Sequence, residues 1–539
     1  MRIDIGLEIE NSGVFIKPDN NILVITLNFS KFIENNKYKI PQGQDNIDVG
    51  DIATPLSSHM IYNSLESKDA NIISKIETKD TIEYYFHCKI ILDMVVGDFG
   101  KSVDKTTIEK FLHKKAFISP IFFSHPDNKT QEKNYRSIFE KEVYINCNCF
   151  ERLKFSNCEF KSKISLHKPE NKYEITEFHN GINFENCIFN GEIEFRNLVS
   201  GTPLPNDKYY NNERETNFKN CIFKKRVDFS NAKFCNNVYF NNSHFKGYAD
   251  FHECEFEKTA CFYGATFHNK AIPNFSQAIF KENLNFVNVK CDFEFENLKE
   301  RIKQEKEQDS KKTLDKFAND FRDSFRLIKN ALVKDNNLLD ASNFHKYELY
   351  CKEIELDSKN PKIFSKDFID KWQLFFYRIT SNHHTDLLKS FHSLLVVIGI
   401  FAFLNIATII GFNCYCLQNI SLSPYTLIAH HNAIIKHLLN CNYISLLGIN
   451  FALAVVFILL FCFSLCSKIR KIIISLSYFL VLLLLISLPQ YIIPTIGIFT
   501  DKRPLLDPLS IIGGIYTLLF AIMFFSLIKT ARKNSIIPH

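Results

Sequence analysis

The chain has 539 residues, of which 46% are apolar and 23% are charged, the proportions of an ordinary globular protein. The formal net charge of +6 is small for this length, so composition gives no support for a nucleic-acid-binding protein. Before about residue 386 the sequence is charged and rich in Asn, Lys and Phe, and after it uncharged apolar runs dominate. The length and this asymmetry predict three or four folding units, the last of them in a membrane.

Residues 1–140 are expected to form an α/β cap domain in front of a repeat region. ILVITLNF (22–29) and IEYYFHCKIIL (82–92) have the composition of β-strands, and a helix is predicted over 106–114. The first residues, MRIDIGLEIE, lack the apolar stretch of a secretory signal. The chain before the first membrane span is therefore predicted to stay in the cytoplasm.

An eleven-residue repeat occupies the middle of the chain, residues 141–296. Two series of Phe each step by eleven residues and are offset by five, and a small residue stands two positions before each Phe of the second series. Side chains two positions apart point to the same side of an extended backbone, so each such pair is expected to face inward. The positions that define this repeat core are Phe218, Cys221, Phe223, Phe229, Ala232, Phe234, Phe240, Ser243, Phe245, Phe251, Cys254, Phe256, Phe262, Ala265 and Phe267.

The spacing predicts a parallel β-solenoid, because the inward positions do not share one face of a helix and the chain must turn every five or six residues. Phe then stacks on Phe from coil to coil, at about 4.8 Å. If two units complete a coil, each coil has 22 residues and the stack holds about five or six coils. Loops are predicted at 167–183 and 196–217, and the repeat slips by two residues around Pro273.

This pattern resembles the pentapeptide-repeat family in its Phe-centred form, over roughly residues 144–295. The resemblance implies a right-handed, four-sided β-helix that offers flat sides to a partner protein. Strict members keep five residues on each side, whereas this chain alternates five and six. Soluble members that bind DNA gyrase imitate the charge of DNA, but residues 141–296 carry 20 Lys and Arg against 21 Asp and Glu, which disfavours that role.

The 16 cysteines give no zinc-site pattern, and nine of them fall within the repeats. In a reducing compartment they are expected to be small buried hydrophobes. No residues are spaced as a nucleophilic catalytic set. The chain is therefore predicted to be no enzyme and to need no cofactor or metal.

Residues 297–360 are predicted to form a helical hairpin or connector that packs on the last coil or on itself; a seam between copies is the alternative. A charged run, KERIKQEKEQDSKK, precedes an apolar stripe with helical steps of three and four, and a second helix is expected over 340–357. The residues expected to be buried in the two helices are Leu314, Phe317, Phe321, Phe325, Ile328, Leu332, Phe344, Tyr347, Leu349, Tyr350 and Ile354.

Residues 393–539 are predicted to form four transmembrane helices, because four uncharged runs are long enough to cross the hydrocarbon core of a bilayer. Lys and Arg gather before the first run, between the second and third, and after the last. The positive-inside rule then places both termini in the cytoplasm of a multi-pass protein, expected in the cell inner membrane. The four runs are 393–412, 443–466, 472–493 and 508–528.

The juxtamembrane segment 361–392 is expected to contain an interfacial helix over 366–380. Trp372, Tyr377 and Arg378 are the predicted membrane-interface residues, because aromatic and basic side chains favour the headgroup region. The alternative is a helix that packs on the soluble side.

The loop between the first two spans is predicted to face the oxidising side. A disulfide from Cys441 to Cys414 or Cys416 is therefore predicted in this loop. A metal site is a weaker prediction, on a cluster that comprises His430, His431, His437 and Cys441.

The sequence as a whole predicts an integral membrane protein whose cytoplasmic solenoid is a protein-interaction scaffold. Its expected partners are the lipid bilayer, a protein on the solenoid and a second copy of the chain, with no nucleic acid. Two alternatives stay open: an oligomeric channel or pore gated by the cytoplasmic domain, and a membrane enzyme that uses the outer loop.

Overall fold

The computed structural model separates the chain into two compact units, residues 1–359 and 360–539. The structure describes residues 7–8, 14–19, 22–28, 61–62, 65, 71–95, 116–117, 134–145, 148–149, 153–166, 176–178, 181–202, 214–269, 271–308, 311–412, 443–487 and 508–532.

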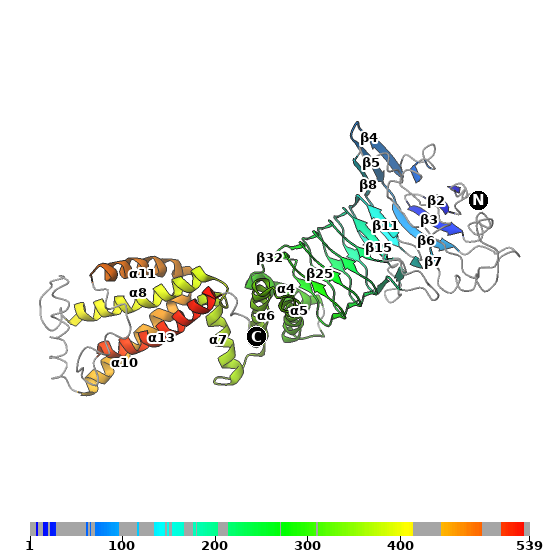
Figure 1. The fold of residues 1–539 in the computed structure, drawn as a ribbon. Helices are drawn as coiled ribbons and strands as arrows, with labels where there is room; N and C mark the ends of the chain where they lie inside the picture. Colours follow the sequence, from blue (N-terminus) through cyan, green and yellow to red (C-terminus); the bar gives the residue numbers. More distant parts are fainter. Residues whose placement is uncertain are drawn as a thin grey trace. The chain divides into compact units, whose positions relative to one another are not determined.

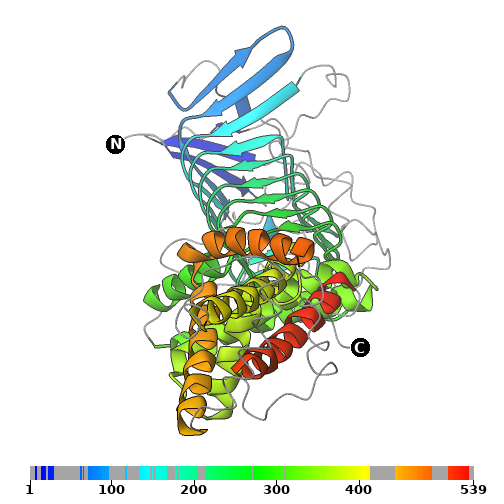
Figure 2. The ribbon, with the colours of Figure 1, turned by 90° about the vertical axis from the view of Figure 1, so that its left-hand side faces the viewer.

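The first unit is a stack of coils in which short parallel strands build four sheets, with one strand from each coil in each sheet (Figure 1). Figure 2 shows the rungs of successive coils lying one on another. The solenoid predicted from the repeat is therefore confirmed. From strand to strand along the chain, the path visits sheets D, B, A and C in turn, so sheet B lies opposite sheet C.

Sheet A contains β1 (Leu7–Glu8), β2 (Val14–Asp19), β3 (Ile22–Asn28), β6 (Lys89–Val95), β9 (Val143–Ile145), β13 (Ile164–Ser165), β17 (Ile193–Glu194), β21 (Val227–Asp228), β25 (Ala249–Asp250) and β29 (Pro273–Asn274). Sheet B contains β4 (Ile73–Glu77), β5 (Thr81–Phe86), β8 (Asn134–Phe139), β12 (Cys158–Phe160), β16 (Ile188–Phe189), β20 (Ile222–Phe223), β24 (His244–Phe245), β28 (Thr266–Phe267) and β32 (Lys290–Cys291).

Sheet C contains β7 (Ala116–Phe117), β10 (Asn148–Cys149), β14 (Thr176–Phe178), β18 (Leu198–Ser200), β22 (Lys233–Phe234), β26 (Glu255–Phe256) and β30 (Ile279–Phe280). Sheet D contains β11 (Leu153–Ser156), β15 (Ile182–Glu185), β19 (Thr216–Asn217), β23 (Val238–Tyr239), β27 (Ala260–Cys261) and β31 (Leu284–Asn285).

The strand register gives the length of a coil. Ile222 pairs with His244 and Val227 with Ala249, so the regular coil has 22 residues and consists of two eleven-residue units. Ala249 pairs with Pro273, a step of 24 residues that places the predicted two-residue slip in this coil. The predicted loops at 167–183 and 196–217 are too long, because β14, β18, β19 and the start of β15 lie inside them.

Two corners of the coils are occupied by residues at positive φ, a backbone conformation that Asn and Gly adopt at lower cost than other residues. In each of these corners Asn recurs at the same place in several coils. One corner column is Asn157, Asn186, Asn220, Asn242, Gly264 and Asn288; the other is Asn197, Asn231, Glu253 and Gln277.

The strands before residue 140 continue the same sheets. β8 pairs in parallel with both β5 and β12, and β6 pairs with β3 and β9. The predicted strand at 82–92 is in fact two strands, β5 and β6, because the chain turns a corner between them and enters a different sheet. The helix predicted over 106–114 lies outside the described residues.

Helices α4 (Phe295–Gln308), α5 (Leu314–Lys334) and α6 (Leu338–Lys359) close the last coil. The Tyr347 hydroxyl accepts from the Phe293 N–H at 3.2 Å and donates to the Cys291 carbonyl at 3.3 Å. Phe286 of the last coil contacts Phe344, with ring centroids 5.8 Å apart. Of the residues expected to be buried here, all are buried except three, which are partly exposed: Leu314, Phe317 and Leu349.

The second unit consists of α7 (Lys366–Ser381), α8 (Leu387–Phe412), α10 (Tyr443–Leu465), α11 (Ser467–Ser487) and α13 (Pro508–Ala531). The last four are long and apolar enough to cross a membrane. α8 begins six residues before the predicted span and α11 five residues before. The described part of α11 ends at Ser487, so residues 488–493 of that predicted span lie outside the described residues.

α8 is the central helix of this bundle. In its apolar window 67% of the residues are buried, against 17–22% in the other three helices. Phe401 of α8 stacks on Tyr516 of α13, with ring centroids 4.0 Å apart and an interplanar angle of 10°. The core around α8 is thus filled by apolar side chains.

Candidate partner-binding surface

The interior of the solenoid is built from the predicted repeat residues. All fifteen are at most 2% exposed. Phe rings stack along the coil axis at every step of 22 residues; Phe223, Phe245 and Phe267 follow one another with centroids 4.7 Å apart. Because this distance matches the spacing of parallel strands, each ring contacts the one above and the one below it over its whole face.

The polar and thiol groups of this interior are satisfied by the backbone. Ser243 Oγ donates to the Phe218 carbonyl at 2.5 Å and accepts from the Cys221 N–H at 3.0 Å. Cys254 Sγ lies 3.0 Å from the Phe229 carbonyl, and burial raises the pKa of this thiol well above its usual range. A protonated, buried thiol is inert, so Cys254 is a packing group. Function on the solenoid therefore belongs to its outer faces.

Sheet C presents charges that neutralise one another. Lys233 lies 3.1 Å from Glu255 and 2.9 Å from Glu257, and Lys281 lies 2.5 Å and 3.3 Å from the same two carboxylates. The hydrogen bonds from Lys281 and Lys233 lower the pKa of Glu255. We call these four residues the paired-charge face. Its side chains alternate in sign from coil to coil and offer little net charge to a partner.

Sheet B lies on the opposite side. Its ion pairs, Lys75 with Glu77 and Arg136 with Glu159, lie toward the N-terminal end, and the coils that follow carry exposed basic residues. Lys246 is in register with Lys224, because its N–H bonds to the Phe223 carbonyl at 2.8 Å, and His268 follows in the next coil. In the neighbouring column His244 pairs with Thr266, and Thr266 pairs with Lys290. We define the lysine face by these exposed side chains: Lys224, His244, Lys246, His268 and Lys290.

The charges of the lysine face are not neutralised by nearby carboxylates of the described residues. Among the described residues, none of its three lysines makes an ion pair, in contrast to Lys233 and Lys281. The pKa of His244 is lowered by partial burial and then by the nearby His268, Lys246 and Lys290. The positive charges on this face repel one another, and an acidic ligand would reduce that repulsion. Asp292, two residues beyond Lys290, is an exposed acidic residue at the C-terminal end of the lysine face.

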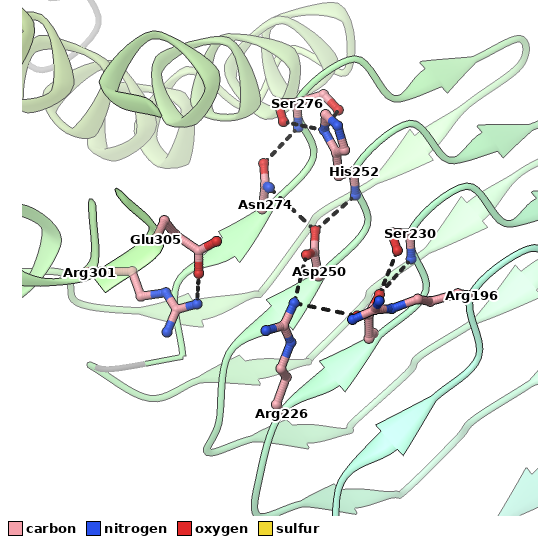
Figure 3. A network of polar contacts seen from close by, with 10 residues as sticks. Arg196, Arg226, Ser230, Asp250, His252, Asn274, Ser276, Arg301 and Glu305 are labelled. Atoms are coloured by element: carbon pink, nitrogen blue, oxygen red, sulfur yellow. Dashed lines mark hydrogen bonds and ion pairs between the residues drawn. The ribbon is translucent and has the colours of Figure 1, made fainter. Parts of the chain in front are cut away.

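Sheet A carries a network of polar contacts toward its C-terminal end (Figure 3). Asp228 is 1% exposed and receives an ion pair from Arg196 at 2.6 Å and a hydrogen bond from Ser230 Oγ at 2.7 Å. Arg226 Nη2 lies 3.4 Å from both Asp228 and Asp250. The two carboxylates sit in successive coils, and burial followed by repulsion from Asp228 raises the pKa of Asp250.

The same network joins the solenoid to its cap. The guanidinium of Arg301, on α4, lies over the ring of Tyr248 at 3.5 Å and is also paired with Glu305. Asn274 donates to Asp250 at 3.3 Å, and Ser324 of α5 donates to Asn274 at the same distance. These groups serve the closure of the last coil, so this face is structural where α4 and α5 lie on it.

Sheet D is largely uncharged. Its partly or fully exposed residues include Asn217, Asn241, Tyr263 and Asn285, with Lys219 lying over the Tyr239 ring at 4.3 Å. Within the part of the solenoid that the structure describes, the lysine face combines exposure with charges of one sign that make no ion pair.

The predicted membrane-interface residues lie on α7. Trp372 is 52% exposed, and Tyr377 and Arg378 are half-buried. Tyr377 faces His384, with ring centroids 4.9 Å apart. Their place at a membrane surface stays a prediction. The outer-loop residues His430, His431, His437, Cys414, Cys416 and Cys441 lie outside the described residues.

Reasoning from the total charge of the repeats missed the lysine face. The near-equal numbers of acidic and basic residues do not show that Glu255 and Glu257 are paired on sheet C or that Asp228 and Asp250 are buried on sheet A. The 22-residue spacing of Lys224, Lys246 and His268 is visible in the sequence. Writing the repeats in rows of 22 would have placed these residues in one column.

Comparison with known proteins agrees with the geometry. Residues 213–255 and 251–294 each match the profile of the family described as pentapeptide repeats (9 copies). No curated protein and no solved structure matches the chain. With the Phe columns, the 22-residue coils and the four sheets, these matches identify the solenoid as a pentapeptide-repeat domain, carried on a chain with four long apolar C-terminal helices.

Proposed function

We propose that this protein is a membrane-anchored scaffold whose solenoid binds an acidic segment of a partner protein on the lysine face. One observation carries the proposal: Lys224, Lys246 and Lys290 are exposed and make no ion pair among the described residues, whereas the lysines of the paired-charge face on sheet C are paired. Positive surface charge without local partners steers and orients an acidic ligand, while paired charges do neither.

The shape of the solenoid supports a binding role rather than a catalytic one. Its interior is filled by Phe, and the coils hold the outer side chains in straight columns at fixed spacing. A rigid row of charges costs little conformational entropy on binding, and it fits an extended chain better than a compact substrate. The scaffold is accordingly proposed to have no enzymatic activity of its own.

The four apolar helices are proposed to hold the solenoid at the cell inner membrane. Basic residues stand at the start of α11 and at the end of α13, which lie beside the start of α8: Lys468, Lys471, Lys529 and Arg532. By the positive-inside rule this end lies in the cytoplasm, and the solenoid, which precedes α8 in the chain, lies there too.

A photo-cross-linking amino acid tests the binding face in the full-length protein in its own membrane. It is placed at His244, on the lysine face, or at Ile279, which is 56% exposed on sheet C. The proposal expects one discrete protein adduct from position 244 that is absent from position 279. Adducts of equal yield at both positions contradict a specific face, and an adduct removed by nuclease contradicts a protein partner. Adducts to a second copy alone at both positions favour the pore, in which the solenoid serves self-assembly.

A further inference from the structure

Helix α7 carries an exposed apolar face. Ile369 and Trp372 are 57% and 52% exposed, and on a helix they share one face with Phe376, which is packed against the bundle core. The loop before the helix adds Ile363 and Phe364, which are 71% and 88% exposed. Four large apolar side chains in ten residues are far more than isolated surface hydrophobes, so this end of the helix is built to be covered.

The other half of α7 is fixed to the membrane helices. Phe376 lies against Phe461 of α10, with ring centroids 6.2 Å apart. Ser393 Oγ of α8 donates to the Thr380 carbonyl at 2.7 Å, and Lys389 Nζ donates to the Arg378 carbonyl at 2.9 Å. These contacts hold the direction of α7 relative to α8.

The turn between α7 and α8 has three successive residues at positive φ, Asn382, His383 and His384. This turn sends the chain in a new direction, and α7 runs across the end of α8 rather than along it (Figure 1). Because α8 is the central membrane helix, a helix that crosses its end lies in the plane of the membrane surface. The face that begins at Phe376 on the bundle then continues through Trp372 and Ile369 toward the surrounding lipid.

Basic side chains surround the same end of the bundle. Arg470 of α11 donates to Ser393 of α8 at 2.7 Å, and Ser390 of α8 bonds to Thr530 of α13 at 3.1 Å, so the start of α8 meets the start of α11 and the end of α13. The basic residues at this end of the bundle, together with those on α7, are Lys366, Lys371, Arg378, Lys389, Lys468, Arg470, Lys471, Lys529 and Arg532. Against these, the described acidic residues are three: Asp367, Asp370 and Asp386.

We propose that α7 is an in-plane membrane helix that inserts Ile369 and Trp372 among lipid chains while the surrounding basic residues bind anionic phospholipid headgroups. An apolar face on a helix that carries cations on its flanks is the arrangement by which in-plane helices bind the headgroup layer. Two separate observations support lipid as the occupant: the apolar face is continuous with the lipid-spanning bundle, and the local charge is complementary to anionic headgroups. The inference does not depend on what the solenoid binds.

The chain contains a single Trp and 21 Tyr, so fluorescence excited at a wavelength that Tyr does not absorb reports on Trp372 alone. The protein is reconstituted in phosphatidylcholine vesicles that contain phosphatidylglycerol and lipids brominated either near the headgroup or near the chain ends. We expect headgroup-side bromines to quench at least half of the emission, chain-end bromines to quench less, and aqueous iodide to quench little. Quenching by iodide without quenching by bromine overturns the proposal, and so does protection from both quenchers, because a protein surface then covers Trp372.

The anionic part of the proposal has its own test. Replacing phosphatidylglycerol with phosphatidylcholine should reduce bromine quenching of Trp372 at least twofold, and the double variant Lys366→Gln/Lys371→Gln should do the same in the presence of phosphatidylglycerol. The matched control, Lys258→Gln/Lys281→Gln on the solenoid, removes the same charge and should leave quenching unchanged. Equal quenching in both lipids, or an equal effect of the two double variants, contradicts binding of anionic headgroups by α7.

Discussion

Phe218 and Phe240 stack face to face, with ring centroids 5.0 Å apart and an interplanar angle of 3°. The two residues are 22 positions apart in the chain, and Phe262 continues the column at 4.9 Å. Columns of this kind hold the coils in register, because a slip of one residue would turn each Phe outward. The same register places Lys224, Lys246 and His268 in one line on the outside, so the order of the interior determines the chemistry of the surface.

Replacing Phe240 by Ala is expected to destabilise the solenoid by about 3–5 kcal/mol, because the ring is fully buried between two others and leaves a cavity. Phe240→Asp should abolish folding of the repeat region, since a carboxylate would be buried without a partner. Limited proteolysis of the full-length protein measures both effects. Tyr263→Ala is the control, because Tyr263 is 43% exposed and its loss should cost less than about 1 kcal/mol. Equal protease sensitivity of the Ala variants at 240 and 263 would contradict the stacked core.

Glu253→Asn is expected to stabilise the solenoid by about 0.5–1 kcal/mol. Glu253 occupies a corner with φ of 56°, where equivalent coils have Asn, and Asn adopts this conformation at lower cost. Asn231→Ala, one coil earlier in the same column, should destabilise by a similar amount. Chemical denaturation of the two variants and the parent protein measures the opposite signs. If Glu253→Asn lowered the stability, the explanation by positive φ at this corner would be contradicted.

The helical hairpin α5–α6 is expected to weaken in acid. Burial alone would raise the pKa of Glu348, but hydrogen bonds from His345, Lys329 and Arg326 outweigh it and hold the pKa at about 2. A carboxylate with a depressed pKa stabilises the fold above its unfolded pKa of about 4.3 and loses that contribution as the pH falls toward 2. Because Glu348 is partly exposed, the expected contribution is about 1–2 kcal/mol.

Denaturation of the parent protein and of Glu348→Gln between pH 7 and pH 3 tests this expectation. The variant should be less stable at pH 7, and the difference between the two proteins should shrink as the pH falls. A difference that stays constant over this range would show that Glu348 stabilises the hairpin by packing rather than by charge.

Gly399 is expected to be essential for the packing of α8 against α11. A methyl group on its Cα would overlap the side chain of Ser477, whereas one on Gly411, in the same helix, would meet nothing within 4 Å. Close approach at a small residue stabilises helix pairs in membranes by packing. Gly399→Val should therefore lower the thermal stability of the detergent-solubilised protein, and Gly411→Val should not. Similar melting temperatures for the two variants would contradict the close contact.

The sequence was sufficient to predict the solenoid because the spacing of Phe indicates directly which side chains face inward. The strand at 82–92 was harder, since its apolar residues run through a corner and no Gly or Pro marks the turn between Phe86 and Lys89. The corner positions could be assigned only from the structure. An Asn at positive φ looks like any other Asn in the sequence, although its recurrence every 22 residues is an indication.

Prediction of the candidate site was limited by charge pairing. Net charge cannot distinguish Lys281, which is paired with two carboxylates, from Lys246, which is exposed on the opposite sheet. The burial of Asp228 and Asp250 cannot be read from the sequence either, because the arginines that contact them come from other coils. Long-range contacts of this kind follow from the fold and not from local patterns.

The most direct test of the scaffold proposal compares two double variants with the same charge. Lys224→Gln/Lys246→Gln removes two lysines from the lysine face, and Lys258→Gln/Lys281→Gln removes two that pair with carboxylates elsewhere on the solenoid. The yield of the protein adduct from position 244 is measured for both in the native membrane. A drop of at least tenfold in the first variant, with the second near the parent level, is the predicted result. Equal yields in both variants would contradict partner binding through the lysine face.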